Sequence, residues 1–226
     1  MPGPVPAPDA AAVLEELIRL GDSSHLDGMS RYGIRVDHAV GVSLPNLRQL
    51  ARRTGRSHDL ALALWATGIH EARILAGLVD EPEAVTPEQM DSWVADLDSW
   101  DVCDQTMTNL FSRTTFARER ALEWSRHSDE FSKRAGFALM AAIAVRDKTA
   151  SDASFSEFLI AIERESDDAR NYVRKAVNWA LRQIGKRNVA LRDEALATAV
   201  RMRARGTPAA RWIASDAIRE LAPIDQ

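Results

Sequence analysis

The stretch RNYVRKAVNWALRQIGKRN, from Arg170 to Asn188, has the pattern of one long helix followed by a short breaker, GKRN. Its apolar side chains recur at the three- and four-residue spacing that places them on one face of a helix: Val173, Ala176, Val177 and Ala180. Such a face must be covered by a neighbour. The segment therefore predicts a helix packed within a larger helical assembly.

The same helical period extends over most of the chain. DAAAVLEELIRL begins at Asp9, a suitable N-cap, and SLPNLRQLARR begins with Ser43 as cap and Pro45 in the first turn, where its missing N–H does no harm. Further helices are predicted at Ser57–Trp65, His70–Val79, Thr86–Ala95, Ser99–Phe111, Phe116–Ser125, Glu130–Val145, Asp152–Glu163, Ala169–Gly185, Val189–Arg205 and Pro208–Leu221. The alternating β-branched runs that indicate strands are not found.

Ten or more helices joined by short loops predict antiparallel helical pairs, and pairs that recur every few tens of residues are typical of HEAT or armadillo repeats. We therefore expect an all-α fold, an α-solenoid of HEAT-like antiparallel helical pairs with a concave basic face. Residues 9–226 are expected to form one such domain, closed at its start by one or two helices. The Pro-rich residues 1–8, MPGPVPAP, are expected to be disordered.

Composition limits the kind of protein. The 226 residues are 46% apolar and 27% charged, as in ordinary globular domains. Cys103 is the sole cysteine, which excludes an intramolecular disulfide and a cysteine-based zinc cluster. Neither a signal peptide nor an apolar run long enough for a bilayer is seen. We expect a soluble, cytoplasmic protein that acts as a monomer without contact to membranes.

The net charge of −4 conceals a strong asymmetry along the chain. From Arg170 to Arg192 there are seven Lys and Arg and no acid, whereas from Asp80 to Asp104 there are nine acids and no base. Because salt screens charges beyond about 10 Å, such patches act locally. An acidic protein can therefore still hold a polyanion on a basic face.

Several common catalytic motifs are absent: GxGxxG, GxxxxGK[ST], GxSxG and HExxH. The five histidines (His25, His38, His58, His70 and His127) show no ligand spacing, so we interpret each as a surface or capping residue. Neither a metal nor an organic cofactor is expected.

The acidic stretch DLDSWDVCDQ, Asp96 to Gln105, surrounds a tryptophan with four carboxylates. Asp98 and Asp101 suit the start of a helix, where the macrodipole favours negative charge. Trp100 and Asp104 are four residues apart and so share a helix face, where a cation would meet both an anion and an electron-rich ring. A core tryptophan beside an unrelated acid is the alternative on sequence alone.

The basic stretch has strong potential for binding phosphates. The side chains that would bind them are Arg170, Arg174, Lys175, Arg182, Lys186 and Arg187. Trp179 lies within the same helix. The alternatives are a solvated basic face and a tryptophan that anchors the core. Seven cations without one balancing acid favour contact with a polyanion.

Several ungapped blocks resemble the AlkD-like DNA alkylation repair glycosylase family. They are GVSLPNLRQLAR, ALALWATGIHEARILAG, MDSWV, WDVCD, FSKRAGF, KAVNWALRQIGKRN and ARWIASDAIREL, in that order, and they cover roughly Tyr32 to Leu221. The resemblance implies a HEAT-like solenoid that grips duplex DNA and excises cationic N3- and N7-alkylated purines. Members are thought to act without swinging the base into a pocket, unlike most glycosylases.

The same resemblance implies roles for four residues. Asp104 matches the catalytic acid, Trp100 and Trp179 match two flanking tryptophans that would pack against the deoxyribose and backbone, and Arg134 matches an arginine that would hold a phosphate. An alkylated purine already carries positive charge and leaves without a proton, so Asp104 would stabilise the oxocarbenium-like sugar and position a water. A non-catalytic solenoid that binds damaged or branched DNA, and a protein-binding HEAT scaffold, are the second and third hypotheses.

Overall fold

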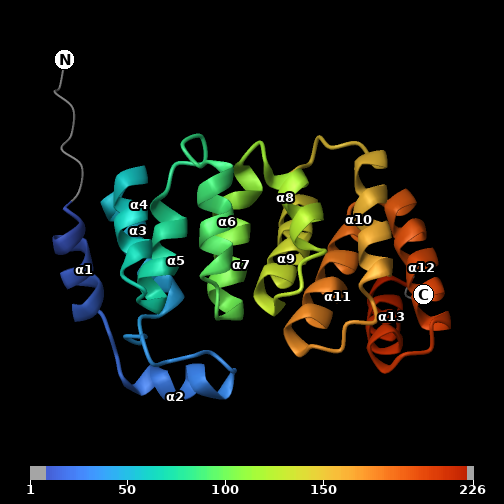
Figure 1. Ribbon diagram of the computed structural model, residues 1–226, viewed down its shortest axis with the longest axis horizontal. Coiled ribbons are helices and arrows are strands. Elements are labelled where there is room, and N and C mark those ends of the chain that lie inside the picture. Colours follow the sequence, from blue (N-terminus) through green and yellow to red (C-terminus); the bar gives the residue numbers. More distant parts are fainter. Residues whose placement is uncertain (1–8, 223–226) are drawn as a thin grey trace. The chain divides into compact units, whose positions relative to one another are not determined.

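The computed structural model describes residues 9–222, which form thirteen α-helices and one short 3-10 helix without any strand (Figure 1). The prediction of disorder for residues 1–8 lies outside this range. Contacts between residues divide the chain into two compact units, one ending at Thr114 and the other beginning at Thr115. The expectation of one domain over residues 9–226 stays a prediction.

The first unit holds seven α-helices and the 3-10 helix. Their bounds are α1 Ala10–Arg19, α2 Ser24–Arg31, α3 Leu44–Thr54, α4 His58–Ala66, α5 His70–Val79, α6 Pro87–Ala95, α7 Trp100–Asn109 and η1 Phe111–Arg113. Asp9 caps α1 through its side chain, as expected, and Ser43 is the N-cap of α3. Helix α5 packs against α3, α4 and α7, so it is the central element of this unit.

The second unit holds six helices. Their bounds are α8 Ala117–Trp124, α9 Glu130–Arg146, α10 Ala153–Arg164, α11 Asn171–Gly185, α12 Val189–Ala204 and α13 Pro208–Leu221. Contacts are densest between α9 and α11, and α11 also packs against α12 and α13. Every helix predicted from periodicity is confirmed within two residues at each end, and the end of the segment predicted as Ser99–Phe111 is the start of η1.

Side-chain contacts recur at a fixed sequence offset in each unit, which shows the repeat directly. In the first unit the offset is 31 residues, as in the hydrogen bonds from Trp65 to Asp96 and from His70 to Asp101. In the second unit it is 38 residues, as in Asn178 to Asp216 and Arg201 to Glu163. Equivalent positions of consecutive helical pairs therefore meet, which is the arrangement expected of stacked repeats.

Each unit has a core of its own. In the first, Trp65 and Trp93 stack with their ring centroids 4.0 Å apart and Phe111 completes the aromatic cluster. In the second, Phe155 and Phe158 meet edge to face with their centroids 6.0 Å apart. Large buried aromatic side chains account for much of the stability of small helical units, because each removes a large apolar area from water.

Gly136 sets the distance between α8 and α9. A Cβ atom added there would lie 2.5 Å from the backbone nitrogen of Ser125 and 2.9 Å from the carbonyl oxygen of Ala121. Only glycine permits so close an approach, and it stands two residues after Arg134 on the same helix. The tight contact therefore fixes the part of α9 that carries this arginine.

Among residues 9–222, the structure contains no helix that combines the length and the apolar character needed to cross a bilayer.

Candidate DNA-binding and catalytic site

Helix α7 carries the acidic site residues. Ser99 is its N-cap, and the helix begins with Trp100. Asp104 follows one turn later on the same face, and both side chains are half-buried. Asp98, which the sequence suggested as a cap, lies outside the helix and faces Arg35 at 3.6 Å. The structure thus brings Trp100 and Asp104 together as predicted from their spacing.

The indole of Trp100 is fixed in place by the segment after α2. Its Nε1 donates a hydrogen bond of 3.0 Å to the carbonyl oxygen of Tyr32. The ring also forms part of the wall of a pocket of about 340 Å³, which is lined mainly by apolar side chains that include Met29, Leu47 and Ile74. Trp100 is therefore oriented by a hydrogen bond and by packing, rather than being a freely rotating surface residue.

A buried ion pair anchors the first turn of α7. His70, at the start of α5 and 6% exposed, places Nε2 2.9 Å from Oδ2 of Asp101, and the hydroxyl of Ser99 donates to Oδ1 at 2.5 Å. Burial alone would lower the pKa of His70, but the hydrogen bond and the charge of Asp101 outweigh it and raise this pKa. Burial would raise the pKa of Asp101, and the hydrogen bond from His70 reverses that and lowers it.

This pair corrects the interpretation of His70 drawn from the sequence and adds a partner to that of Asp101. His70 is a buried partner of an acid and not a surface or capping residue. Asp101 does lie in the first turn of α7, where the macrodipole favours it, but its main partner is His70. No sequence signal connects the two residues, because they are 31 positions apart on different helices. Within residues 9–222, no three His, Cys, Asp or Glu side chains gather closely enough to hold a metal.

Arg134 lies on α9 in the second unit and is 5% exposed. Its Nη1 donates to the carbonyl oxygen of Tyr172 at 2.8 Å, which ties α9 to the start of α11. The ring of Phe131 lies against the ring of Tyr172 with their centroids 5.4 Å apart and supports the same contact. The role of Arg134 as a phosphate ligand stays a prediction.

Trp179 lies on α11, half-buried, in the same unit as Arg134. Its indole N–H has no acceptor among residues 9–222. Lys175 precedes it by one turn, and Arg182 and Lys186 follow it by one and two turns, so they share its side of the helix. Trp179 is thus embedded in a row of cations, as the sequence indicated.

Acids from α13 neutralise part of that row. Arg182 and Lys186 both pair with Glu220, and Arg182 also faces Asp216 at 3.7 Å. Lys175 is exposed and makes no ion pair within the described part of the chain. The stretch from Arg170 to Arg192 contains no acid in its sequence, but in the folded protein acids of α13 lie beside it.

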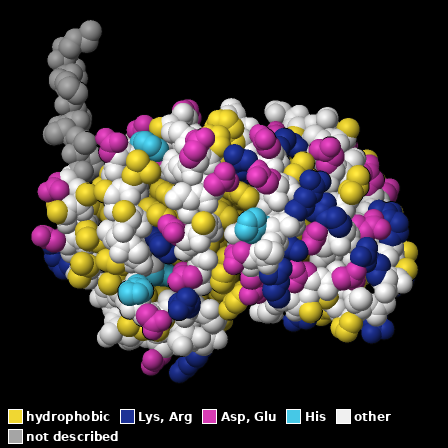
Figure 2. All heavy atoms as spheres, viewed as in Figure 1, with side chains coloured by type: hydrophobic (Ala, Val, Ile, Leu, Met, Phe, Trp, Pro, Cys, Tyr) yellow, Lys and Arg dark blue, Asp and Glu magenta, His cyan; other side chains and the backbone are white. Residues whose placement is uncertain are grey.

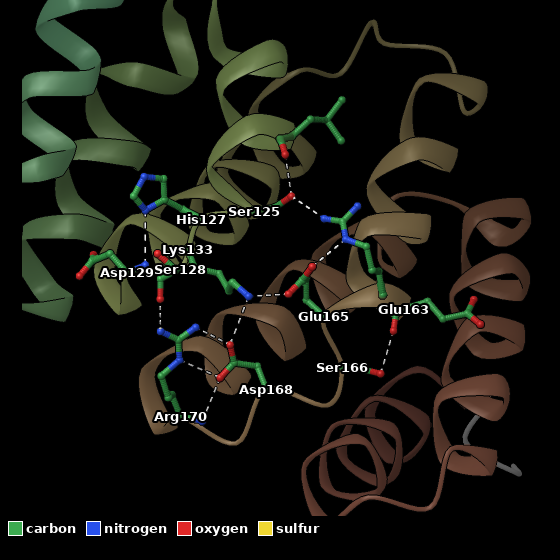
Figure 3. Close-up of polar contacts among 12 residues, drawn as sticks. Ser125, His127, Ser128, Asp129, Lys133, Glu163, Glu165, Ser166, Asp168 and Arg170 are labelled. Carbon is green, nitrogen blue, oxygen red and sulfur yellow. Dashed lines mark hydrogen bonds and ion pairs between the residues drawn. The ribbon is translucent and has the colours of Figure 1, made fainter.

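The two ends of the basic stretch serve the fold. Arg170 donates to Asp168 through Nε and Nη2, at 3.0 and 2.6 Å, and to the carbonyl oxygen of Ser128 (Figure 3). Arg187 donates to the carbonyl oxygen of Ala144 at 2.6 Å and lies 4.3 Å from the ring centroid of Phe155. DNA contacts by all six predicted basic residues stay a prediction, and these two have structural partners already.

Charge is divided unevenly between the two units. The first carries nine Lys and Arg against 17 Asp and Glu, and the second carries 20 against 16. Figure 2 shows the consequence on one face, where dark blue side chains are most frequent over the helices of the second unit. Trp100 and Asp104 thus belong to the acidic unit, and Arg134 and Trp179 belong to the basic one.

Comparison with known proteins shows the family of the chain that carries these residues. The sequence profile described as "DNA alkylation repair enzyme" matches residues 13–221, which is nearly the whole described chain. The chain belongs to the DNA alkylation repair enzyme family. Membership supports DNA as its partner and confirms the resemblance found in the sequence.

The fold is likewise that of a known group. A solved structure described as "a new family of proteins related to the HEAT-like repeat DNA glycosylases with affinity for branched DNA structures" matches with a TM-score of 0.76 at 22% identity. The match covers 86% of this chain and 83% of that one. The prediction of an all-α, HEAT-like fold is confirmed. Among curated proteins, no sequence matches this chain.

Proposed function

We propose that this protein is a DNA glycosylase that excises cationic N3- and N7-alkylated purines from duplex DNA. The observation that carries the proposal is the shared, half-buried face of α7 that presents Trp100 and Asp104 in a chain of the alkylation repair family. A carboxylate beside an indole suits a site where positive charge develops, because both groups stabilise a cation.

The chemistry needs little beyond these groups. An alkylated purine is a cation and becomes neutral when the bond to C1′ breaks, so it needs no general acid. The electron pair of that bond leaves with the base, and positive charge develops on the deoxyribose. Asp104 would stabilise that charge and orient the water that attacks C1′, whose released proton passes to solvent or to the carboxylate. Trp100 and Trp179 would pack against the deoxyribose, and Arg134 would hold a phosphate.

The orientation of α7 supports this role. The pair of His70 and Asp101 and the hydrogen bond from Trp100 to Tyr32 hold the first two residues of α7 in place. A catalytic carboxylate is effective when it is positioned before the reaction, since no reorganisation is then needed as charge develops. Asp104, one turn further along, benefits from that rigidity.

The test is release of free base from duplex DNA that carries N7-methylguanine or, separately, N3-methyladenine. We expect Asp104→Asn to lower the single-turnover rate by roughly 100-fold or more while DNA binding persists. Asp59→Asn is the matched control, because it removes an exposed carboxylate from the first turn of α4. Equal rates for wild type and Asp104→Asn would remove Asp104 from the mechanism.

A non-catalytic DNA-binding protein is the second candidate function. It is favoured by the similar solved fold, whose proteins are described as having affinity for branched DNA structures. It predicts that the wild type binds DNA but releases no base from either lesion, and that a three- or four-way junction is bound more tightly than a linear duplex. Measuring base release and binding on the same samples separates the two candidates.

A further inference from the structure

Trp212, on α13, is an exposed indole covered on part of its ring by an arginine. The side chain is 37% exposed, and the guanidinium carbon of Arg174 on α11 lies 4.9 Å from the ring centroid. A single exposed tryptophan is ordinary on a protein surface. A guanidinium stacked upon it adds a positive charge directly at the edge of an accessible aromatic surface.

Arg174 and two cations next to Arg174 and Trp212 in the sequence lack acidic partners within the described part of the chain. Lys175 and Arg211, the residues adjacent in sequence to Arg174 and Trp212, are exposed and form no ion pair within residues 9–222. The guanidinium of Arg174 has one weak contact, 3.4 Å from Nη2 to Oδ1 of Asn171, and its Nε is buried without a hydrogen bond. None of these three positive charges is balanced by an acid within residues 9–222.

The second halves of the same two helices behave differently. There Arg182 and Lys186 pair with Glu220, and Arg219 pairs with Asp216. The cations without an acidic partner among residues 9–222 on α11 and α13 thus lie in the first halves of these helices, as does the exposed indole. This coincidence indicates a ligand that carries both negative charge and an aromatic or planar group.

We infer that Trp212, Arg174, Lys175 and Arg211 bind an unpaired nucleotide of DNA. The base stacks on the exposed part of the indole, and the cations contact the adjoining phosphates, which is how single strands are held on many proteins. Bases within a duplex are stacked on one another and cannot reach the ring, so the surface favours single-stranded segments. The inference shares with the proposed function only DNA as the ligand, and it does not involve Asp104.

The test is a fluorescence anisotropy titration with three labelled DNAs: a blunt duplex, the same duplex with a single-stranded oligothymidine overhang, and the single strand alone. We expect Trp212→Ala to weaken binding of the overhang and single-strand probes by fivefold or more and binding of the blunt duplex by less than twofold. Trp212→Phe, which keeps a ring for stacking, restores most of the loss. Arg211→Ala weakens all three probes and lowers their dependence on salt.

Two controls match these changes. Ile160→Ala removes an exposed apolar side chain from α10. Arg203→Ala removes from α12 an exposed cation that forms no ion pair with the other described residues, so neither change should alter the preference for the overhang. Thermal melts of every variant confirm that the fold persists. Equal weakening of blunt and overhang probes by Trp212→Ala, or no weakening of either, would overturn the inference, as would failure of the wild type to bind the single strand.

These outcomes are independent of catalysis. If base release from a blunt duplex depends on Asp104 but not on Trp212, and overhangs are not preferred, the proposed glycosylase activity stands and the nucleotide site at Trp212 is refuted. If overhangs are preferred through Trp212 but no base is released, the nucleotide site stands and the glycosylase activity is refuted.

Discussion

His70 and Asp101 form a buried ion pair, 2.9 Å from Nε2 to Oδ2, that joins the first residue of α5 to the first turn of α7. Ser99 donates a hydrogen bond to Asp101, and Trp100 lies between these two residues in the sequence. The pair of His70 and Asp101 therefore helps to orient the start of α7, which carries Trp100 and Asp104. A structural contact of Asp101 thus supports the chemistry proposed for Asp104.

The pair predicts how stability depends on pH. The pKa of His70 is raised above its usual 6.5 by Asp101, with help from Glu71 and Asp98 and against the effect of burial. The stabilisation that the protonated imidazole of His70 provides is therefore fully present below pH 6.5 and is lost as the pH rises through the raised pKa. The thermal midpoint of the wild type should fall over that interval, and His70→Gln should lower the midpoint and flatten this fall.

The control for this titration is His127→Gln, which changes an exposed histidine and should leave the fall in place. Asp101→Asn should destabilise by about 3 kcal/mol, since it leaves a buried charge without its partner. Parallel pH curves for the wild type and His70→Gln would show that His70 does not titrate in this range.

Local patterns revealed the helices, and non-local contacts decided what the charges do. The apolar residues Val173, Ala176 and Val177 recur at the helical period and predict α11. The four-residue spacing of Trp100 and Asp104 predicts that they share one face of a helix. The partners of Arg182 and Lys186 were invisible, because Glu220 lies on another helix and reaches them only after the helices stack. Counting charges along the chain therefore overstated how much of the basic stretch is available to DNA.

Gly136 should tolerate no side chain. Gly136→Ala places a Cβ 2.5 Å from the backbone nitrogen of Ser125, which cannot move without separating α8 from α9. We expect a loss of about 1–3 kcal/mol in the free energy of unfolding, measured by denaturant titration. Gly28→Ala is the matched control, because the space around Gly28 in α2 is open, and it should stabilise by roughly 0.5–1 kcal/mol. Equal effects at both sites would contradict the close packing of α9 on α8.

Lys133 should stabilise the loop between α10 and α11. Its Nζ lies 2.5 Å from Glu165 and 3.4 Å from Asp168, two acids that Figure 3 shows converging on it. Lys133→Met leaves these carboxylates without their shared cation, so we expect a loss of about 2–3 kcal/mol that is reduced at high salt. Lys148→Met removes an exposed lysine that has no ion pair among residues 9–222 and should change stability by less than about 0.5 kcal/mol.

The basic stretch should separate into residues that bind DNA and residues that hold the fold. Lys175 is exposed and has no acidic partner in the part of the chain that the structure describes, whereas Arg187 donates to the carbonyl oxygens of Ala144 and Ala150 and lies over Phe155. Lys175→Met should lower the slope of log K against log salt for duplex binding by about 0.9 with no change in the thermal midpoint. Arg187→Met should lower stability by about 1–3 kcal/mol, because it removes the donor to two part-buried carbonyl groups, and should leave the slope unchanged. Binding isotherms at four or more salt concentrations, with melts of the same samples, measure both quantities. A fall in slope for Arg187→Met equal to that for Lys175→Met would show that the contacts of Arg187 within the fold do not withdraw it from DNA.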